Sequence, residues 1–249
     1  MGGIIFNIGK PNTKMMRSFT LRPLFTVVVS LLLLSSLWAQ ELPTAKPEDV
    51  GLSSERLQRL TAVFQAYATD KKMAGSVVLI ARHGKVAYFN SFGKRDIESN
   101  AAMQNDAIFR IASQTKALVS VGIMILQEEG KLLINDPVDK YIPEFKESTV
   151  AVPREGGGYD VVKAKRAITL RDLLTHTAGI SYGGGPAADK WKEAGITGFY
   201  FADRDEPIGA TIARMAKLPM DAHPGEKYIY GYNTDILGVV IEKASGKSL

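Results

Sequence analysis

Apolar and polar positions follow a helical period near residue 60. In "LSSERLQRLTAVFQAYATDKK" the apolar side chains recur three or four positions apart, and Ser53 or Ser54 can cap the start of a helix. The next stretch, "SVVLIARHGKVAYFNSFG", contains two runs rich in β-branched and aromatic residues on either side of His83-Gly84. We therefore expect a helix followed by an antiparallel hairpin.

The pattern becomes mostly helical after residue 109. The strongest helix is expected from Ser113 to Glu129, a shorter one in "TLRDLLTHTAGI" with Thr169 as its N-cap, and a last one ending near Gly246. "REGGGYDVVKAKRA" and "SYGGGPAADKWKEAG" are rich in glycine and polar residues, which predicts surface loops. This order of elements predicts an α+β fold. Its antiparallel sheet has flanking helices and carries a helical lobe inserted after the first hairpin.

Composition separates the first 39 residues from the rest. Four of the 31 basic residues and none of the 26 acidic residues lie there, and an apolar run extends from Leu24 to Ala39. The run is short for a membrane span and is followed by polar residues. Residues 1–39 are therefore predicted to be a cleaved export signal, with an uncleaved membrane anchor as the alternative. A cleaved leader implies a periplasmic or secreted protein without a stable membrane span, whose domain is residues 40–249.

The same composition excludes several classes of function. The chain has no cysteine, which rules out disulfides, thiolate metal sites and cysteine nucleophiles. Its three histidines lack the spacing of a metal-ligand set, so neither a metal nor a cofactor is expected. Most of the net charge of +5 comes from the leader, and the near-neutral remainder gives no electrostatic reason to expect nucleic acid.

Ser113 and Lys116 form the pattern S-x-x-K, which Ser91 and Lys94 repeat by chance. Residues three apart share a face on a helix but point to opposite faces of a strand, so only Ser113 is expected to have its lysine beside it. The start of a helix favours an oxyanion, and burial would lower the pKa of Lys116 so that it could accept a proton from serine. The apolar run 117–126 is expected to hold this turn in the core. The alternative is a plain N-cap serine with a surface lysine.

Six segments occur in an order that is typical of one family: "PEDVGLSSERLQRL", "AGSVVLIARHGKVAYFNSFGKRD", "IFRIASQTKAL", "NDPVDKYIPEF", "ITLRDLLTHTAGI" and "HPGEKYIYGYNTDILGVVIEKASG". With these segments, residues 47–249 resemble the class C β-lactamase and penicillin-binding-protein-like serine hydrolases, closest to the β-lactamase-like esterase branch. S-x-x-K followed by a second motif is the signature of such enzymes. The resemblance implies a serine β-lactamase/transpeptidase-like fold with a site between its lobes.

The resemblance also implies roles for individual residues. Ser113 would be the acylated nucleophile, Lys116 its partner base and Tyr230 the family tyrosine. The third position of the family's Y-x-N motif holds Tyr232, and Asn233 follows one step later. Both are expected to bind substrate. The displaced asparagine favours ester cleavage over β-lactam hydrolysis.

The function implied by the resemblance is that of an exported serine hydrolase. It would act through an acyl-enzyme on small esters, β-lactams or D-amino-acyl peptides, and His176 would be a structural helix-end residue. The alternative is a penicillin-binding-like envelope protein that binds without turnover. In the family a third motif, often K-T-G, H-x-G or W-x-G, follows the last helix, whereas here only "KSL" follows Gly246. We therefore expect a truncated domain with an incomplete sheet and an active site that is encoded only in part.

Overall fold

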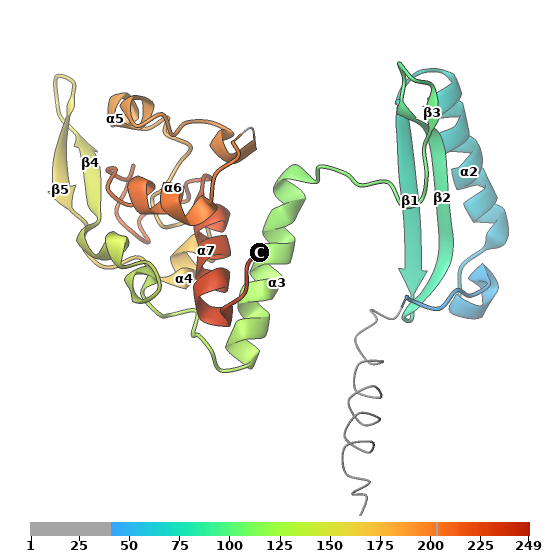
Figure 1. Ribbon diagram of the computed structural model, residues 1–249, viewed down its shortest axis with the longest axis horizontal. Coiled ribbons are helices and arrows are strands. Elements are labelled where there is room, and N and C mark those ends of the chain that lie inside the picture. The colour runs from blue at the N-terminus through green and yellow to red at the C-terminus, as the bar shows by residue number, and fades with distance from the viewer. Residues whose placement is uncertain (1–40, 203) are drawn as a thin grey trace, which may run out of the picture. The chain divides into compact units, whose positions relative to one another are not determined.

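The computed structural model describes residues 41–202 and 204–249, so the predicted export signal lies outside the described residues. The described residues form two compact units, one that ends at Ile108 and one from Phe109 to Leu249, which are coloured blue to green and green to red in Figure 1. Within the described ranges, no helix is both long enough and apolar enough to cross a membrane. Helices and antiparallel strands occur in both units, which confirms the α+β fold class.

The first unit begins with a 3-10 turn, η2 (Pro47–Val50), and the long helix α2 (Ser54–Thr69). Ser53 is the N-cap of α2, and its side chain accepts a hydrogen bond from the Arg56 backbone N–H. Leu57, Leu60 and Phe64 of the apolar stripe are half-buried, whereas Val63 and Tyr67 are exposed. Phe64 of α2 stacks on Phe92 with 5.5 Å between ring centroids.

The sheet of this unit has the strand order β1-β2-β3, with β1 (Gly75–Arg82), β2 (Lys85–Asp96) and the short β3 (Ala101–Ala102). The predicted hairpin is confirmed, because β1 and β2 pair in antiparallel register around the two-residue turn His83-Gly84. Both turn residues have positive φ, 53° and 70°, as a type I′ turn requires. The sheet has three strands, one more than the hairpin alone supplies.

The second unit contains most of the helices. Its elements, in chain order, are η3 (Ala112–Gln114), α3 (Thr115–Glu128), η4 (Val138–Lys140), η5 (Pro143–Glu147), β4 (Thr149–Pro153), β5 (Tyr159–Lys163), α4 (Leu170–Leu174), α5 (Ala188–Glu193), η6 (Tyr200–Ala202), α6 (Ile208–Met215) and α7 (Asn233–Ser245). The last helix is the centre of this unit, since α3, α4 and α6 all pack against it. Ile123, Ile212 and Ile236, from three of these helices, are completely buried in one core.

Two predicted loops contain regular structure, so those predictions are wrong. Residues 154–167 include the strand β5, which pairs with β4 across a turn in which Gly156, Gly157 and Gly158 all have positive φ. Residues 181–195 include the helix α5, whose Trp191 is buried and donates to the Pro219 carbonyl at 2.9 Å. The glycines that suggested loops are confined to the turns, and β5 carries no alternating apolar pattern because its residues are mostly exposed.

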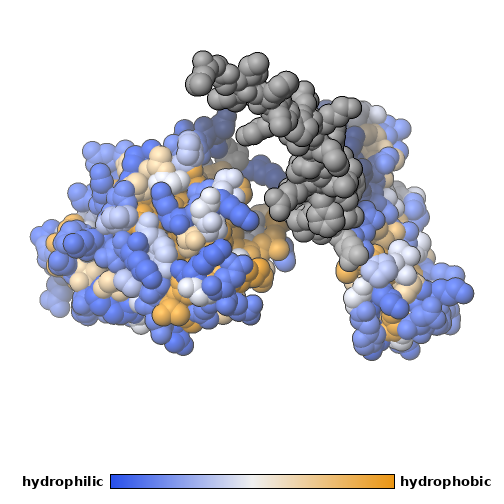
Figure 2. Space-filling view, turned by 60° about the horizontal axis from the view of Figure 1, so that its bottom comes forward, coloured by the Kyte–Doolittle hydropathy of each residue, from blue (hydrophilic) through white to orange (hydrophobic). Residues whose placement is uncertain are grey.

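The helix after Ser113 is also less buried than its sequence indicates. Val119, Ile123 and Leu126 enter the core, whereas Leu118 and Val121 are more than half exposed. Part of the surface of this unit is accordingly apolar (Figure 2). The expectation that the run 117–126 holds the turn of Ser113 in the core is therefore wrong, because α3 buries one face only and Ser113 itself is exposed.

Candidate active site

Ser113 lies in a 3-10 turn immediately before α3. The helix begins two residues later than expected, and its N-cap is Gln114, so Ser113 is not the cap of this helix. The preceding residue, Ala112, has a φ of 44°, in the left-handed region that residues with a side chain rarely adopt. Backbone strain of this kind is concentrated at functional sites. The tight turn presents the Ser113 hydroxyl at the surface of the second unit.

The hydroxyl of Ser113 has two side-chain partners. Its Oγ lies 2.8 Å from the hydroxyl of Tyr230, and the Nζ of Lys116 donates to it at 3.2 Å. The Nζ of Lys116 also lies 4.7 Å from the centroid of the Tyr230 ring. The structure therefore brings together all three side chains that the resemblance nominated for chemistry, although 117 positions separate Ser113 from Tyr230.

The second S-x-x-K pattern shows no such arrangement. Ser91 lies on β2 and donates to the Met103 carbonyl, whereas Lys94 donates to the Asn100 carbonyl. Both side chains thus donate hydrogen bonds to backbone carbonyl groups of the first unit. The difference follows from local geometry, because residues three apart in a strand point to opposite faces.

Tyr230 is held by a short segment that leads into α7. Its ring stacks on His176 with 4.8 Å between centroids, and Tyr182 meets it edge-on at 5.8 Å. The next residue, Gly231, packs directly against residues 180 and 181, and a Cβ there would lie 2.4 Å from the Ile180 carbonyl oxygen. Only glycine allows this approach, so Gly231 helps to place Tyr230 beside Ser113.

The pKa of Lys116 shifts in the direction opposite to the expected one. Burial lowers the pKa of Lys116, as expected, but the phenols of Tyr230 and Tyr182 outweigh burial and the net pKa is raised. The pKa of Tyr230 is lowered, chiefly by its hydrogen bond with Lys116 and then by that with Ser113. The prediction of a neutral, proton-accepting Lys116 is therefore wrong. This geometry favours a lysine that stays protonated beside a tyrosine that ionises more readily.

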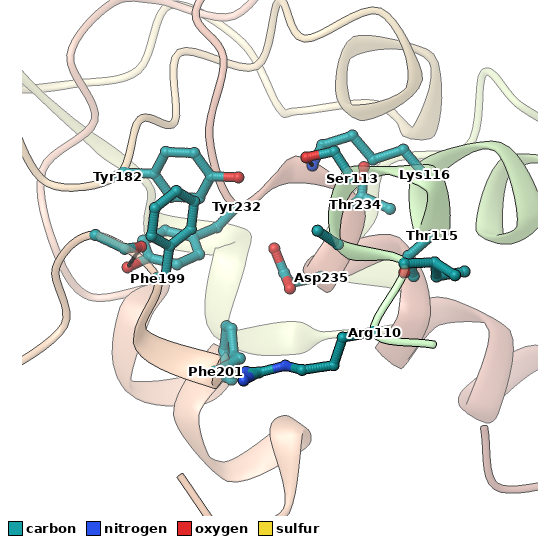
Figure 3. Close-up of a pocket in the computed structure, with 13 residues that line it drawn as sticks. Arg110, Ser113, Thr115, Lys116, Tyr182, Phe199, Phe201, Tyr232, Thr234 and Asp235 are labelled. Atoms are coloured by element: carbon teal, nitrogen blue, oxygen red, sulfur yellow. Dashed lines mark hydrogen bonds between the residues drawn. The ribbon is translucent and has the colours of Figure 1, made fainter. Parts of the chain in front are cut away.

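A cavity of about 780 Å³ opens beside Ser113. Ser113 and Lys116 form one side of it and aromatic side chains form the other, with Asp235 between them (Figure 3). The lining residues are Arg110, Ile111, Ala112, Ser113, Thr115, Lys116, Tyr182, Gly198, Phe199, Phe201, Tyr232, Thr234 and Asp235. The cavity combines a polar reactive edge with apolar walls, as is typical of sites for small molecules.

The two residues expected to bind substrate lie in different surroundings. Tyr232 contributes to the cavity wall but is nearly inaccessible to solvent, and its hydroxyl donates to the Gly198 carbonyl at 2.8 Å. Asn233 is completely buried and does not line the cavity. Its amide nitrogen contacts the His176 Nδ1 at 2.9 Å and the Ile180 carbonyl at 3.2 Å. In this structure Asn233 therefore stabilises the segment around His176 through hydrogen bonds.

Most of the cavity lining was not identified from the sequence, including Tyr182 and Asp235. Tyr182 lies in a loop, in contact with both Tyr230 and Tyr232, and nothing in its local sequence indicates this position. Asp235 was detectable in principle, because it is an acidic residue in the first turn of α7, directly before the apolar run 236–241. As for metals, the residues that the structure describes include no cluster of three or more acidic or histidine side chains that could hold an ion.

Comparisons with known proteins identify the family of this chain. The family model described as Beta-lactamase matches residues 60–249. This chain belongs to the Beta-lactamase family. It is 33% identical over 196 residues to the esterase EstB of Burkholderia gladioli, an alignment that covers 77% of this chain and 46% of EstB.

Solved structures of the family have the same fold. The structure of EstCE1, described as a hydrolase with promiscuous acyltransferase activity, matches with a TM-score of 0.62 and 30% identity over 77% of this chain and 48% of that one. A penicillin-binding protein homologue from Pyrococcus abyssi matches with a TM-score of 0.52 and 29% identity over 77% and 40% of the two chains. The chain thus spans about half the length of the relatives it matches.

Proposed function

We propose that this protein is a serine hydrolase that works through an acyl-enzyme on Ser113. The observation that carries this proposal is the contact of the Ser113 Oγ with both the Tyr230 hydroxyl and the Lys116 Nζ, at the edge of the cavity. A nucleophile in hydrogen-bond contact with a group that can take its proton, itself oriented by a third group, is the general arrangement for covalent catalysis.

The proposed reaction has two steps. The Ser113 Oγ attacks the carbonyl carbon of the substrate, its proton passes to the Tyr230 phenolate, and the protonated Lys116 stabilises that phenolate beforehand. Tyr230 then gives the proton to the leaving group, whose bond to the carbonyl carbon breaks. In the second step a water molecule gives a proton to the Tyr230 phenolate as its oxygen attacks the carbonyl carbon of the acyl-enzyme. The bond between that carbon and the Ser113 Oγ then breaks, and Tyr230 returns the proton to the Oγ. The products are an acid, the alcohol or amine released in the first step, and the free enzyme.

The substrates we propose are small esters, with β-lactams and D-amino-acyl peptides as the other candidates. Esters are favoured because the third position of the tyrosine motif holds the buried Tyr232 rather than an asparagine amide facing the cavity. The names of the relatives EstB and EstCE1 point the same way. The penicillin-binding protein homologue supports β-lactams as candidates, and a relative named as a D-alanyl-D-alanine carboxypeptidase supports D-amino-acyl peptides.

The test is covalent labelling with a fluorophosphonate, followed by intact-mass measurement and peptide mapping. One adduct on Ser113 is expected, and it should be absent from Ser113→Ala. The matched control is Ser91→Ala, which removes the other S-x-x-K serine and should label normally. Equal labelling of Ser113→Ala would show that another residue is the nucleophile. A panel of chromogenic esters and penicillins then separates turnover from binding, because a permanent adduct without product identifies a binding protein.

We also propose that the protein is exported to the periplasm or secreted. Support comes from the basic residues and the apolar run of residues 1–39, which match the organisation of a signal peptide. Expression in a bacterial host should give a mature protein that begins at Gln40. Mass measurement of the protein from the periplasmic fraction or the medium checks this, and an intact leader would favour a membrane anchor.

A further inference from the structure

Asp235 is an acidic side chain inside the cavity of Ser113. It belongs to the first turn of α7, and its carboxyl group points into the open space between the aromatic side and the Ser113 side (Figure 3). Among the residues that the structure describes, no side chain donates a hydrogen bond to this carboxyl group. It is therefore a hydrogen-bond acceptor that faces the space a ligand would occupy.

The other charged groups of the cavity are already engaged. Lys116 donates to Ser113 and lies over the ring of Tyr230, whose phenolate it stabilises. Arg110 has a partner of its own. In the described lining, Asp235 is thus a charged group that forms no salt bridge with another described residue.

A counter-ion beside Asp235 would stabilise the ionised form of this carboxyl group. Burial raises the pKa of this carboxyl to about 6, an effect that the charge of Lys116 only partly offsets. The ionised form dominates at neutral pH but has lost much of its hydration. A cation that enters the cavity would compensate for this loss, whereas a neutral group of the same shape would not.

The aromatic wall is suited to the same kind of ligand. Tyr182, Phe199 and Phe201 line the cavity, and the Phe199 side chain is 80% exposed, so its ring is available to a ligand. Aromatic faces attract alkylammonium groups through the ring quadrupole, and several rings around a carboxylate form a site for such cations.

We propose that this cavity selects substrates that carry an alkylammonium group, with Asp235 as the counter-ion and the rings of Tyr182, Phe199 and Phe201 as walls. The substrate class that follows is an ester with a cationic amine in its acyl or alcohol part. The predicted preference in kcat/KM for cationic esters rests on the proposed function, whereas the predicted binding of the cation does not.

The first experiment measures binding without catalysis. Choline and its neutral isostere 3,3-dimethyl-1-butanol are titrated calorimetrically into the full chain at pH 7.5, and choline should bind about tenfold more tightly. Asp235→Asn should abolish this preference and Asp160→Asn, a change at an exposed carboxyl outside the cavity, should keep it. If the wild-type protein binds both compounds equally, the proposal is overturned.

Acidification supplies a second test that needs no variant. At pH 5 Asp235 is mostly protonated, so the preference for choline should shrink severalfold. The titratable groups that face it keep their charge in this range: the pKa of Lys116 is raised by the phenols beside it, despite burial, and burial raises the pKa of both Tyr182 and Tyr232. The guanidinium of Arg110 also lines the cavity. Phe199→Ala, a change at an exposed position, should also weaken choline relative to the alcohol. A preference unaffected by both pH and Phe199→Ala would contradict the proposal.

The kinetic experiment separates this inference from the proposed function. Acetylcholine and 3,3-dimethylbutyl acetate differ only in the charge of the alcohol, and the ratio of their kcat/KM values should favour acetylcholine by about tenfold. Hydrolysis of both esters at equal rates, lost in Ser113→Ala, would overturn the cation inference and leave the serine hydrolase intact. If neither ester is hydrolysed, ester hydrolysis is refuted and the binding experiment still decides the role of Asp235.

Discussion

At the residue scale, the distribution of charge between Lys116 and Tyr230 is the main feature of the site. The phenol stabilises the ammonium group and the ammonium group stabilises the phenolate, so the pKa of Lys116 is raised and that of Tyr230 is lowered. Two groups whose environments separate their pKa values in this way divide the work of proton transfer. In the proposed mechanism, Tyr230 accepts the proton of Ser113, and Lys116 stabilises the phenolate that does so.

The titration of Tyr230 gives the first prediction. The difference in ultraviolet absorbance between the wild-type protein and Tyr230→Phe should show a phenolate that forms below the pH at which an ordinary tyrosine ionises, about 10. Lys116→Met removes the largest cause of the lowered pKa, so the transition should move to higher pH. Lys94→Met, at the other S-x-x-K pattern, should leave it unchanged. A transition that moves to lower pH in Lys116→Met would contradict this assignment.

The second prediction concerns the shared role of the pair. Residues that act as one unit are strongly non-additive when they are mutated together. Lys116→Ala combined with Tyr230→Phe should therefore reduce kcat/KM, or the rate of fluorophosphonate labelling, little more than the worse of the two single changes. Multiplication of the two single effects would show that the residues act independently.

His176 gives the third prediction. Its ring stacks on Tyr230, its Nδ1 contacts the Asn233 amide, and burial together with the charge of Lys116 lowers its pKa. A neutral His176 is therefore a positioning residue for Tyr230. His176→Phe keeps an aromatic ring and should retain most of the labelling rate, whereas His176→Ala should lose about tenfold or more. Equal losses in both variants would indicate that the imidazole itself takes part in the chemistry.

At the element scale, the short helix α4 is fixed by its N-terminal residues. Thr169 and Asp172 form a capping box, and the Asp172 carboxylate also makes a two-point contact with Arg166, at 2.6 and 2.9 Å. Burial alone would raise the pKa of Asp172, but Arg166 and Thr169 outweigh it and the net pKa is lowered. A five-residue helix cannot be stable by propensity, so these contacts and its packing hold it in place.

The fourth prediction tests these contacts. The Asp172 side chain is only 9% exposed, so Asp172→Ala leaves Arg166 without its partner, and unfolding free energy should fall by about 2–4 kcal/mol in urea titrations. The control is Glu147→Ala, which breaks a pair with Lys163 whose side chains are both 71% exposed and should change little. Since the folded pKa of Asp172 is lowered, its contribution is present at neutral pH and is lost as the pH falls through that value. The two proteins should therefore converge in acid, and a constant difference would contradict this account.

At the scale of the whole molecule, each unit has its own sheet and its own packed side chains. The segment that leads from β3 to the turn of Ser113 contains no helix or strand from residue 103 to residue 111. Within it the Ile108 side chain is fully exposed and that of Phe109 is half exposed. Segments of this kind are the preferred sites of proteolytic cleavage between compact units.

The fifth prediction follows from this exposure. Brief treatment with chymotrypsin should cut first after Phe109, which mass spectrometry of the two fragments identifies. Phe109→Ser removes the aromatic residue that chymotrypsin needs and should delay the first cut. If the first cut falls within α3 or α7 instead, the segment between the two units is not the part of the folded protein that is most susceptible to proteolysis.

The sequence by itself predicted the elements whose signals are local. The period of α2, the His83-Gly84 turn and the Thr169 cap each depend on neighbouring residues, so each could be identified along the chain. Family resemblance added Ser113, Lys116 and Tyr230, and matching of the Beta-lactamase family model confirms the family. The strand β5 escaped detection because an exposed strand beside a glycine turn carries no hydrophobic period.

Only the tertiary structure decided what depends on distance through space. The sequence left open whether Ser113 is a cap or a nucleophile, and the 2.8 Å contact with Tyr230 favours the nucleophile. It also predicted that burial would neutralise Lys116, whereas the phenols folded around this lysine reverse the direction of the pKa shift. The sequence also did not show that Asp235 lies in the cavity, because the other walls of this cavity come from distant parts of the chain. A pKa and a cavity wall are set by groups that come from distant parts of the chain, and only folding brings these groups together.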